Sequence, residues 1–265
     1  MDRTFTQDPH LGNLIKTFGP NRANAKVLLY VIPVFAVVGL IFFFSGFGRS
    51  RPGDAAAFIF GGIVFLLIAA GAFWGYRRQL TAKADVYEQG FLWKHWRGGQ
   101  QIVRWEDINA VFEFIGYDRY QYRATQWLYT VCLKNGEQVK INMAVENIRS
   151  LGALILKESG QRMQLRMMDV YKTGGTAMLD GDLGFSHQGI ISGQRTLPWE
   201  QVEKIHISDR GDLTVHQKGQ HIPWKIMIHS KIPNFPVFRT MLHHIVEDLL
   251  PGARPVIEDP SYKPS

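Results

Sequence analysis

Histidines are the residues of this sequence best suited to chemistry: the chain has nine, and seven lie between His187 and His244. A three-residue turn at 209–211 would place His206 opposite Thr214 and diagonal to His216 on one face of a sheet. Two imidazoles and a carboxylate could bind Zn²⁺. However, the sequence has no HExxH or CxxC motif. We therefore expect a solvated polar sheet face and no metal site.

Nucleophilic and phosphate-binding motifs are also missing from the sequence. Cys132, the single cysteine, lies among apolar strand residues and is expected to be a small buried side chain. There is no GxSxG motif, Asp180–Gly184 lacks the spacing of a calcium loop, and the "KTGGT" segment lacks the P-loop pattern. We expect no catalytic residue and no cofactor.

A binding site is better supported, in the segment Gly116–Trp127. Aromatic and arginine side chains alternate there, and both are favoured at binding hot spots and beside anionic lipid headgroups. The alternative is a hairpin arm that packs on the neighbouring domain. The candidate residues are Tyr117, Arg119, Tyr120, Tyr122, Arg123 and Trp127.

Two runs without a charged residue, Val27–Phe47 and Ala55–Tyr76, are 21 and 22 residues long. Each is long enough for a membrane-spanning helix, and soluble core helices seldom run so far without a charge. The seven-residue connection at 48–54 predicts a hairpin that returns across the bilayer. We expect Gly61, Gly62 and Gly71 to allow close packing of the two helices.

Charge predicts how this hairpin is oriented. Residues 1–83 contain nine Lys/Arg and three Asp/Glu (+6), whereas residues 84–265 contain 21 and 20 (+1). Seven of these basic residues flank the hairpin and two lie in its loop, so both termini are expected on the cytoplasmic side of the inner (plasma) membrane. The near-neutral remainder argues against a nucleic-acid partner. The expected interface residues are Tyr30, Trp74, Tyr76, Arg77 and Arg78.

The remaining sequence contains a repeat, marked by "VRWED" at 103–107 and "LPWEQ" at 197–201. Each copy reads as short alternating strands followed by one helix, and Asn135-Gly136 is a strong hairpin turn signal. We expect the first helix to end at Gly160 and the second to be capped by Asn234. The shared residues Trp105, Glu106, Trp199 and Glu200 are expected to be structural, with each tryptophan covering the open end of a bent sheet.

This order, with "VYEQGFLWKHWRGGQQIVRWEDI" and "FSHQGIISGQRTLPWEQV", resembles bacterial membrane-anchored proteins with tandem pleckstrin-homology-like (PH-like) domains. The resemblance implies an α+β protein with a transmembrane hairpin and two PH-like domains, each a bent antiparallel sheet with a C-terminal helix. The expected parts are an N-terminal tail (1–25), the hairpin (26–80), a first copy (81–160), a linker (161–176), a second copy (177–252) and a flexible tail (253–265).

The N-terminal tail has Leu11, Leu14, Ile15 and Phe18 at helical spacing. It is expected to form an amphipathic turn or two at the membrane surface, or else to dock on the first copy.

The functional expectation is a non-catalytic, membrane-tethered binding or scaffold protein. Its expected partners are the bilayer and a protein, with anionic lipid headgroups as an open alternative. Two alternatives stay open: a structural subunit of a membrane complex, and a metal-assisted enzyme that uses the histidines of the second copy.

Overall fold

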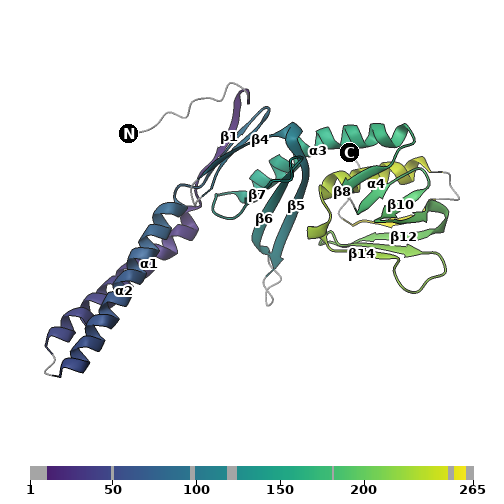
Figure 1. Ribbon diagram of the computed structural model, residues 1–265. Helices are drawn as coiled ribbons and strands as arrows, with labels where there is room; N and C mark the ends of the chain where they lie inside the picture. Colours follow the sequence, from purple (N-terminus) through teal and green to yellow (C-terminus); the bar gives the residue numbers. More distant parts are fainter. Residues whose placement is uncertain are drawn as a thin grey trace. The chain divides into compact units, whose positions relative to one another are not determined.

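The computed structural model describes residues 11–48, 51–95, 99–117, 124–180, 182–249 and 254–260. The protein is α+β, with two long apolar helices followed by several antiparallel sheets (Figure 1), which confirms the α+β class and the order of the helices before the sheets. Its residues form two compact units, one of residues 1–104 and 143–147 and the other of residues 105–142 and 148–265. The first copy is thus divided between the two units.

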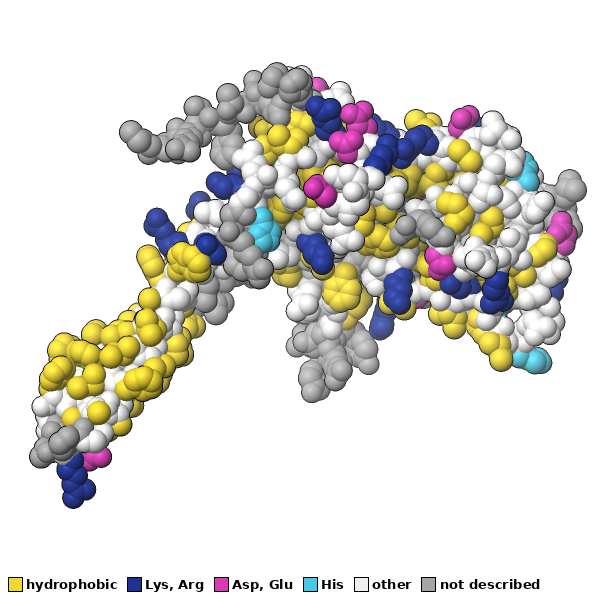
Figure 2. Space-filling model, in the orientation of Figure 1, with side chains coloured by type: hydrophobic (Ala, Val, Ile, Leu, Met, Phe, Trp, Pro, Cys, Tyr) yellow, Lys and Arg dark blue, Asp and Glu magenta, His cyan; other side chains and the backbone are white. Residues whose placement is uncertain are grey.

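The apolar runs form the helices α1 (Arg22–Phe47) and α2 (Pro52–Gln79), which pack along each other. Each contains a stretch long and apolar enough to cross a membrane, and only 11% of each stretch is buried. Figure 2 shows apolar side chains over the visible surface of this hairpin. A core helix of a soluble protein would instead be mostly buried.

Glycines let the two helices approach closely. A Cβ at Gly62 would lie 2.6 Å from the backbone nitrogen of Phe43, and Gly39 and Gly46 are similarly tight. The expectation for Gly62 is therefore confirmed. The expectation for Gly71 was wrong, because nothing lies within 4 Å of a Cβ placed there.

A four-stranded antiparallel sheet follows in the first unit, in the order β1-β2-β3-β4. Residues 14–18 of the N-terminal tail form strand β1 and not an amphipathic helix: Phe18 is buried, whereas Leu14 and Ile15 are about half exposed. An isolated helix of one or two turns is marginal in water, whereas pairing with β2 stabilises the extended backbone, which agrees with the docking alternative. The strands are β1 (Leu14–Phe18), β2 (Lys83–Tyr87), β3 (Gly90–Lys94) and β4 (Gln100–Arg104).

The second unit begins with the short 3₁₀ helix η1 (Trp105–Asp107) and a three-stranded sheet in the order β5-β6-β7. The predicted hairpin turn is present, with Gly136 at φ +86° between β6 and β7. The sheet's strands are β5 (Ile108–Tyr117), β6 (Ala124–Leu133) and β7 (Gln138–Ile141).

Helix α3 (Ile148–Lys172) runs through Gly160, where the sequence predicted its end, and through most of the expected linker. Its N-terminal half buries Leu151 and Ile155, and its C-terminal half buries Met163 and Met167 in the core of the second copy. A glycine inside a helix costs about 1 kcal/mol. Burial of two or more large side chains outweighs that cost, so the helix continues.

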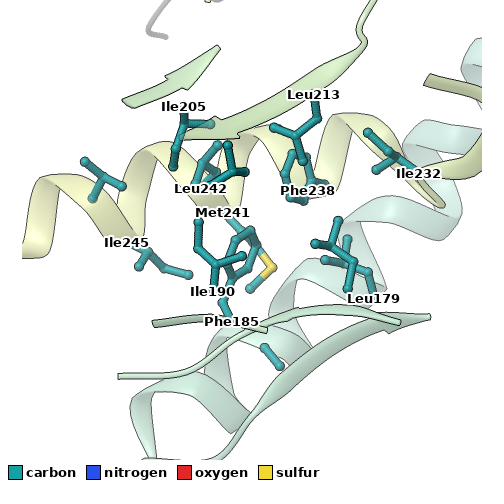
Figure 3. Close-up of a cluster of buried hydrophobic side chains, with 14 of the residues drawn as sticks. Leu179, Phe185, Ile190, Ile205, Leu213, Ile232, Phe238, Met241, Leu242 and Ile245 are labelled. Atoms are coloured by element: carbon teal, nitrogen blue, oxygen red, sulfur yellow. The ribbon is translucent and has the colours of Figure 1, made fainter. Parts of the chain in front are cut away.

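The second copy has two four-stranded sheets, in the orders β11-β10-β9-β8 and β14-β13-β12-β15. Figure 3 shows Phe238, Met241 and Ile245 of α4 pointing toward strand side chains in one apolar core. The elements are β8 (Ala177–Asp180), β9 (Leu183–Phe185), β10 (Gly189–Ser192), β11 (Arg195–Pro198), η2 (Trp199–Gln201), β12 (Val202–Ile207), β13 (Leu213–Gln217), β14 (Lys225–Met227), η3 (His229–Lys231), α4 (Phe235–Asp248) and β15 (Val256–Glu258).

Residues 254–260 of the expected flexible tail are described and contain strand β15, which pairs in parallel with β12. The Asp259 side chain is 1% exposed, and one of its carboxylate oxygens lies 3.2 Å from His243 Nε2 and 3.8 Å from Arg239 Nε. Backbone pairing and a buried carboxylate thus connect this segment to β12 and α4.

The repeat extends beyond the Trp-Glu pair that marks it in sequence. Gly90 lies opposite Arg104, and Gly189 lies opposite Pro198, so each glycine faces the residue just before the tryptophan. A Cβ would lie 2.2 Å from the carbonyl oxygen of Val103 in the first copy, and 2.0 Å from that of Leu197 in the second. Both copies therefore require glycine at this position for the same steric reason.

Candidate functional site

The candidate binding loop is the tip of the β5–β6 hairpin. Residues 118–123, including Arg119, Tyr120, Tyr122 and Arg123, lie outside the described residues. Tyr117 ends β5, and Arg210 of the second copy lies over its ring at 5.3 Å. Trp127 lies on β6, with Arg149 of α3 over its ring at 5.0 Å. Both described aromatics of the loop thus contact arginines from other elements.

A cavity of about 220 Å³ lies beside this hairpin. One wall comes from β5 and the other from the β12–β13 turn and η3 of the second copy. It is lined by Phe114, Ile115, Tyr117, Arg210, Asp212, Ile228, His229 and Ser230.

A polar cluster of Glu113, Tyr129 and His229 lies next to the cavity. Glu113 and Tyr129 are directly opposite in the β5–β6 register, and the Tyr129 hydroxyl donates to Glu113 Oε1 at 2.6 Å. His229 Nε2 lies 3.2 Å from Glu113 Oε2. The Tyr129 ring packs directly on Gly152 of α3, where a Cβ would overlap it.

The charges in this cluster are set by burial and hydrogen bonding. Burial by itself raises the pKa of Glu113, but hydrogen bonds with His229 and Tyr129 and the electrostatic influence of His229 and Arg149 bring it below the ordinary value. Burial raises the pKa of Tyr129, and the bond to Glu113 raises it further. At neutral pH Glu113 is therefore an anion, and Tyr129 is a neutral donor.

Both ring nitrogens of His229 face protein groups. Nε2 contacts Glu113, while Nδ1 is buried without a hydrogen-bond partner among the described residues. A Cβ at Gly211, whose φ is +82°, would lie 2.3 Å from Nδ1. This arrangement fits a ring with its proton on Nε2, since Nδ1 then needs no acceptor.

Backbone contacts hold the same segment in place. The Asn234 backbone N–H donates to the Val111 carbonyl at 2.8 Å, and Asn234 Oδ1 accepts the Val111 N–H at 3.1 Å. Asn234 does occupy the N-cap position of α4, but its side chain makes no capping bond, contrary to expectation. The side chain is fully buried and accepts the backbone N–H of Val111 in β5 instead.

The histidines considered for metal binding occupy separate places. His206 lies opposite Thr214, as predicted, and its Nδ1 lies 3.2 Å from Glu258. His187 stacks on Tyr171 with ring centroids 4.5 Å apart. Within the described parts of the chain, no group of three or more His, Cys, Asp or Glu residues could hold a metal ion.

The expected membrane-interface residues lie on the hairpin helices. Tyr30 is 77% exposed and Trp74 is 59% exposed. The Arg78 guanidinium lies over the Trp74 ring at 3.4 Å, one helical turn away.

The repeat tryptophans are both buried, at 2% exposure for Trp105 and 1% for Trp199. Trp199 Nε1 donates to the Ser186 carbonyl at 3.0 Å, and its ring stacks on Phe185. The glutamates that follow them, Glu106 and Glu200, are exposed.

Sequence reasoning found the β5–β6 hairpin tip but missed the Glu113–Tyr129–His229 cluster. The opposition of Glu113 and Tyr129 depends on the β5–β6 register, and residues 118–123, which join these strands, contain no Asn-Gly pair to signal that register. The contact with His229 had no local signal, because it joins residues 116 positions apart.

These features define an α+β protein with an exposed apolar helix hairpin followed by several antiparallel sheets. The chain belongs to DUF6585, a family of unknown function, which matches residues 3–248. No curated protein matches the chain.

Proposed function

We propose that this protein is a non-catalytic, membrane-tethered binding protein. Its hairpin crosses a bacterial inner membrane with both termini in the cytoplasm, and two PH-like domains recruit a protein partner at that face. The observation that carries the proposal is the pairing of two long, unburied apolar helices with a duplicated module.

The flanks of the helices support this membrane placement. The exposed Trp74 and the stacked Arg78 match the aromatic and basic residues found where helices leave a bilayer. The loop between the helices carries two basic residues against seven on the outer flanks. Lys/Arg bias of this kind places the richer side in the cytoplasm.

The order of elements supports two PH-like domains. Each copy has strands that end at a buried tryptophan in a 3₁₀ helix, then three more strands and a helix. In both copies a glycine, Gly90 or Gly189, packs against a backbone carbonyl of the adjacent strand, which is a further similarity between the copies. We assign the N-terminal half of α3 and the whole of α4 as the closing helices.

The geometry beside the β5–β6 hairpin supports binding more than proton transfer. A general base needs a ring nitrogen that faces the substrate. In His229 one nitrogen contacts Glu113 and the other is buried against Gly211. The cluster therefore holds the hairpin in place, and leaves Tyr117 and Arg210 at the cavity edge for a partner.

Cysteine accessibility tests the membrane arrangement. In a Cys132→Ala background, cysteine would replace Arg51 in the hairpin loop or the exposed Gln100 of β4. We expect a membrane-impermeant maleimide to label Arg51→Cys in intact spheroplasts, and Gln100→Cys only after permeabilisation. Labelling of both positions in intact spheroplasts would contradict a hairpin span, and the reverse pattern would contradict the orientation.

Photo-crosslinking tests binding at the hairpin. A photoreactive residue at Tyr117 should crosslink the full-length protein in native membranes to a discrete protein. The matched control is Gln161, which is exposed on α3. No product at Tyr117, or the same products from both positions, would count against a partner site at the hairpin.

A further inference from the structure

Strand β14 and the loop before it expose large apolar side chains of the second copy. Ile222 is 79% exposed and Ile226 is 63% exposed. β14 is an edge strand of its sheet. Soluble surfaces commonly show single exposed apolar residues, but these two flank the partly exposed Trp224 in sequence and together point to a partner.

The sheet register shows that Ile226 lies on the outer face. Ile226 pairs with Thr214, and Thr214 pairs with His206, so these three residues share one face. The neighbours Met227 and Leu213 are opposite each other and buried in the core. Ile226 therefore points away from the apolar core, whereas the partly buried Trp224 packs against that core and reaches its edge.

Two basic side chains, Arg195 and Lys218, accompany this apolar patch, and Glu258 lies three strands away on the same face as Ile226. Residues 213–246 contain no Asp or Glu. The Arg195 guanidinium lies over the Trp224 ring at 5.3 Å, and Lys218 is exposed in the β13–β14 loop. Lys225 Nζ lies 3.4 Å from a carboxylate oxygen of Asp182. Among the described residues of the patch, Arg195 and Lys218 therefore remain as cations without an acidic partner.

We propose that this Ile222 surface, made of Arg195, Lys218, Ile222, Trp224 and Ile226, docks on a bilayer that contains anionic lipids. Apolar side chains accompanied by Lys and Arg match the boundary between acyl chains and anionic headgroups. Nucleic acid would use the cations but leave the isoleucines in water. This inference rests on the proposed membrane tether, which keeps lipid at a high effective concentration, so a small patch is enough for docking.

An environment-sensitive fluorophore in the loop tests this docking. The full-length protein, with Cys132→Ala and Gln220→Cys, would carry a nitrobenzoxadiazole label in nanodiscs of phosphatidylcholine, with or without phosphatidylglycerol. Gln220 is exposed beside Lys218, and its replacement leaves every residue of the Ile222 surface intact. We expect emission to shift to shorter wavelength, and to be quenched by doxyl-labelled lipid, only in the anionic discs.

Further labels and variants separate the possible outcomes. Adding Lys218→Glu and Ile222→Ser should abolish the lipid response of the loop label. A label at Gln161 on α3 should stay water-like. A label at Phe44, which is 65% exposed on α1, should report lipid in all discs.

A water-like loop label beside a lipid-like Phe44 label would overturn the docking but leave the tether standing. A water-like Phe44 label would instead count against the tether itself. A loop response that depends on protein concentration and not on lipid charge would indicate self-association and would also overturn the docking.

Discussion

Replacing Glu113 by glutamine tests how strongly the polar cluster holds the β5–β6 hairpin. Glu113 accepts one hydrogen bond from Tyr129 at 2.6 Å and contacts His229 at 3.2 Å. The glutamine oxygen can still accept from Tyr129, but the negative charge is lost. Glu113→Gln therefore removes the charge-assisted part of both contacts while keeping the shape of the side chain.

The structure bounds the size of this effect. Hydrogen bonds to buried charged groups contribute about 1.5–3 kcal/mol, against about 1 kcal/mol for neutral ones. The Glu113 side chain is 20% exposed, so the lower part of that range applies. For the two contacts together we expect a loss of about 2 kcal/mol, which corresponds to a change of about 30-fold in an opening equilibrium.

Hydrogen–deuterium exchange of the full-length protein in detergent measures this loss. Amides of β5 and β6 should exchange about 30-fold faster in Glu113→Gln than in the unmodified chain. Glu203→Gln makes the same chemical change at an exposed position of β12 and should leave exchange unaltered. Equal protection of β5 in the Glu113 variant and the unmodified chain would refute the reasoning.

The same comparison has a defined pH dependence. Because the pKa of folded Glu113 lies below its ordinary value of 4.5, its contribution is present above the unfolded pKa and is lost as pH falls through the folded pKa. The difference between the unmodified chain and Glu113→Gln should therefore be full near pH 7 and shrink below about pH 4. A difference that persists unchanged in acid would show that the glutamate charge is not its cause.

Three further substitutions test the packing. Gly62→Leu should destabilise the hairpin by about 1–3 kcal/mol in an SDS titration followed by circular dichroism, because its side chain meets the Phe43 backbone. Gly71→Leu, at an open position, should change the hairpin by less than about 0.5 kcal/mol, and equal effects would contradict the observed helix contact. Gly189→Ala should lower the thermal midpoint by about 4–8 °C (about 2 kcal/mol), because its Cβ would meet the carbonyl oxygen of Leu197 on β11, and an unchanged midpoint would mean that the backbone yields freely. Asp259→Asn should raise amide exchange in β15 about tenfold by weakening the contacts of the buried carboxylate with His243 and Arg239, whereas unchanged exchange would show that backbone pairing alone holds the strand.

Local patterns predicted much of the fold. The uncharged runs predicted both long helices, and the turn residues predicted the β6–β7 hairpin and the pairing of His206 with Thr214. The repeated Trp-Glu pair predicted a duplication, and Gly90 and Gly189 make matching backbone contacts that agree with this prediction. These features depend on residues close together in the chain, where periodicity and turn chemistry act directly.

Helix and strand ends that depend on distant partners were not predictable in this way. Gly160 looked like the end of a helix, yet α3 continues because Met163 and Met167 find a core formed by the second copy. Residues 14–18 had helical spacing but form a strand because β2 offers an open edge. In both places tertiary burial or pairing outweighs the local preference.

The sequence by itself determined the two long apolar helices, the repeated Trp-Glu pair before an alternating strand, and the β6–β7 turn at Asn135-Gly136. Only the tertiary structure decided that Glu113 contacts His229 and that Asn234 pairs with β5. Those contacts join residues more than 110 positions apart. Their partners are chosen by how two packed surfaces meet, and no local periodicity carries that information.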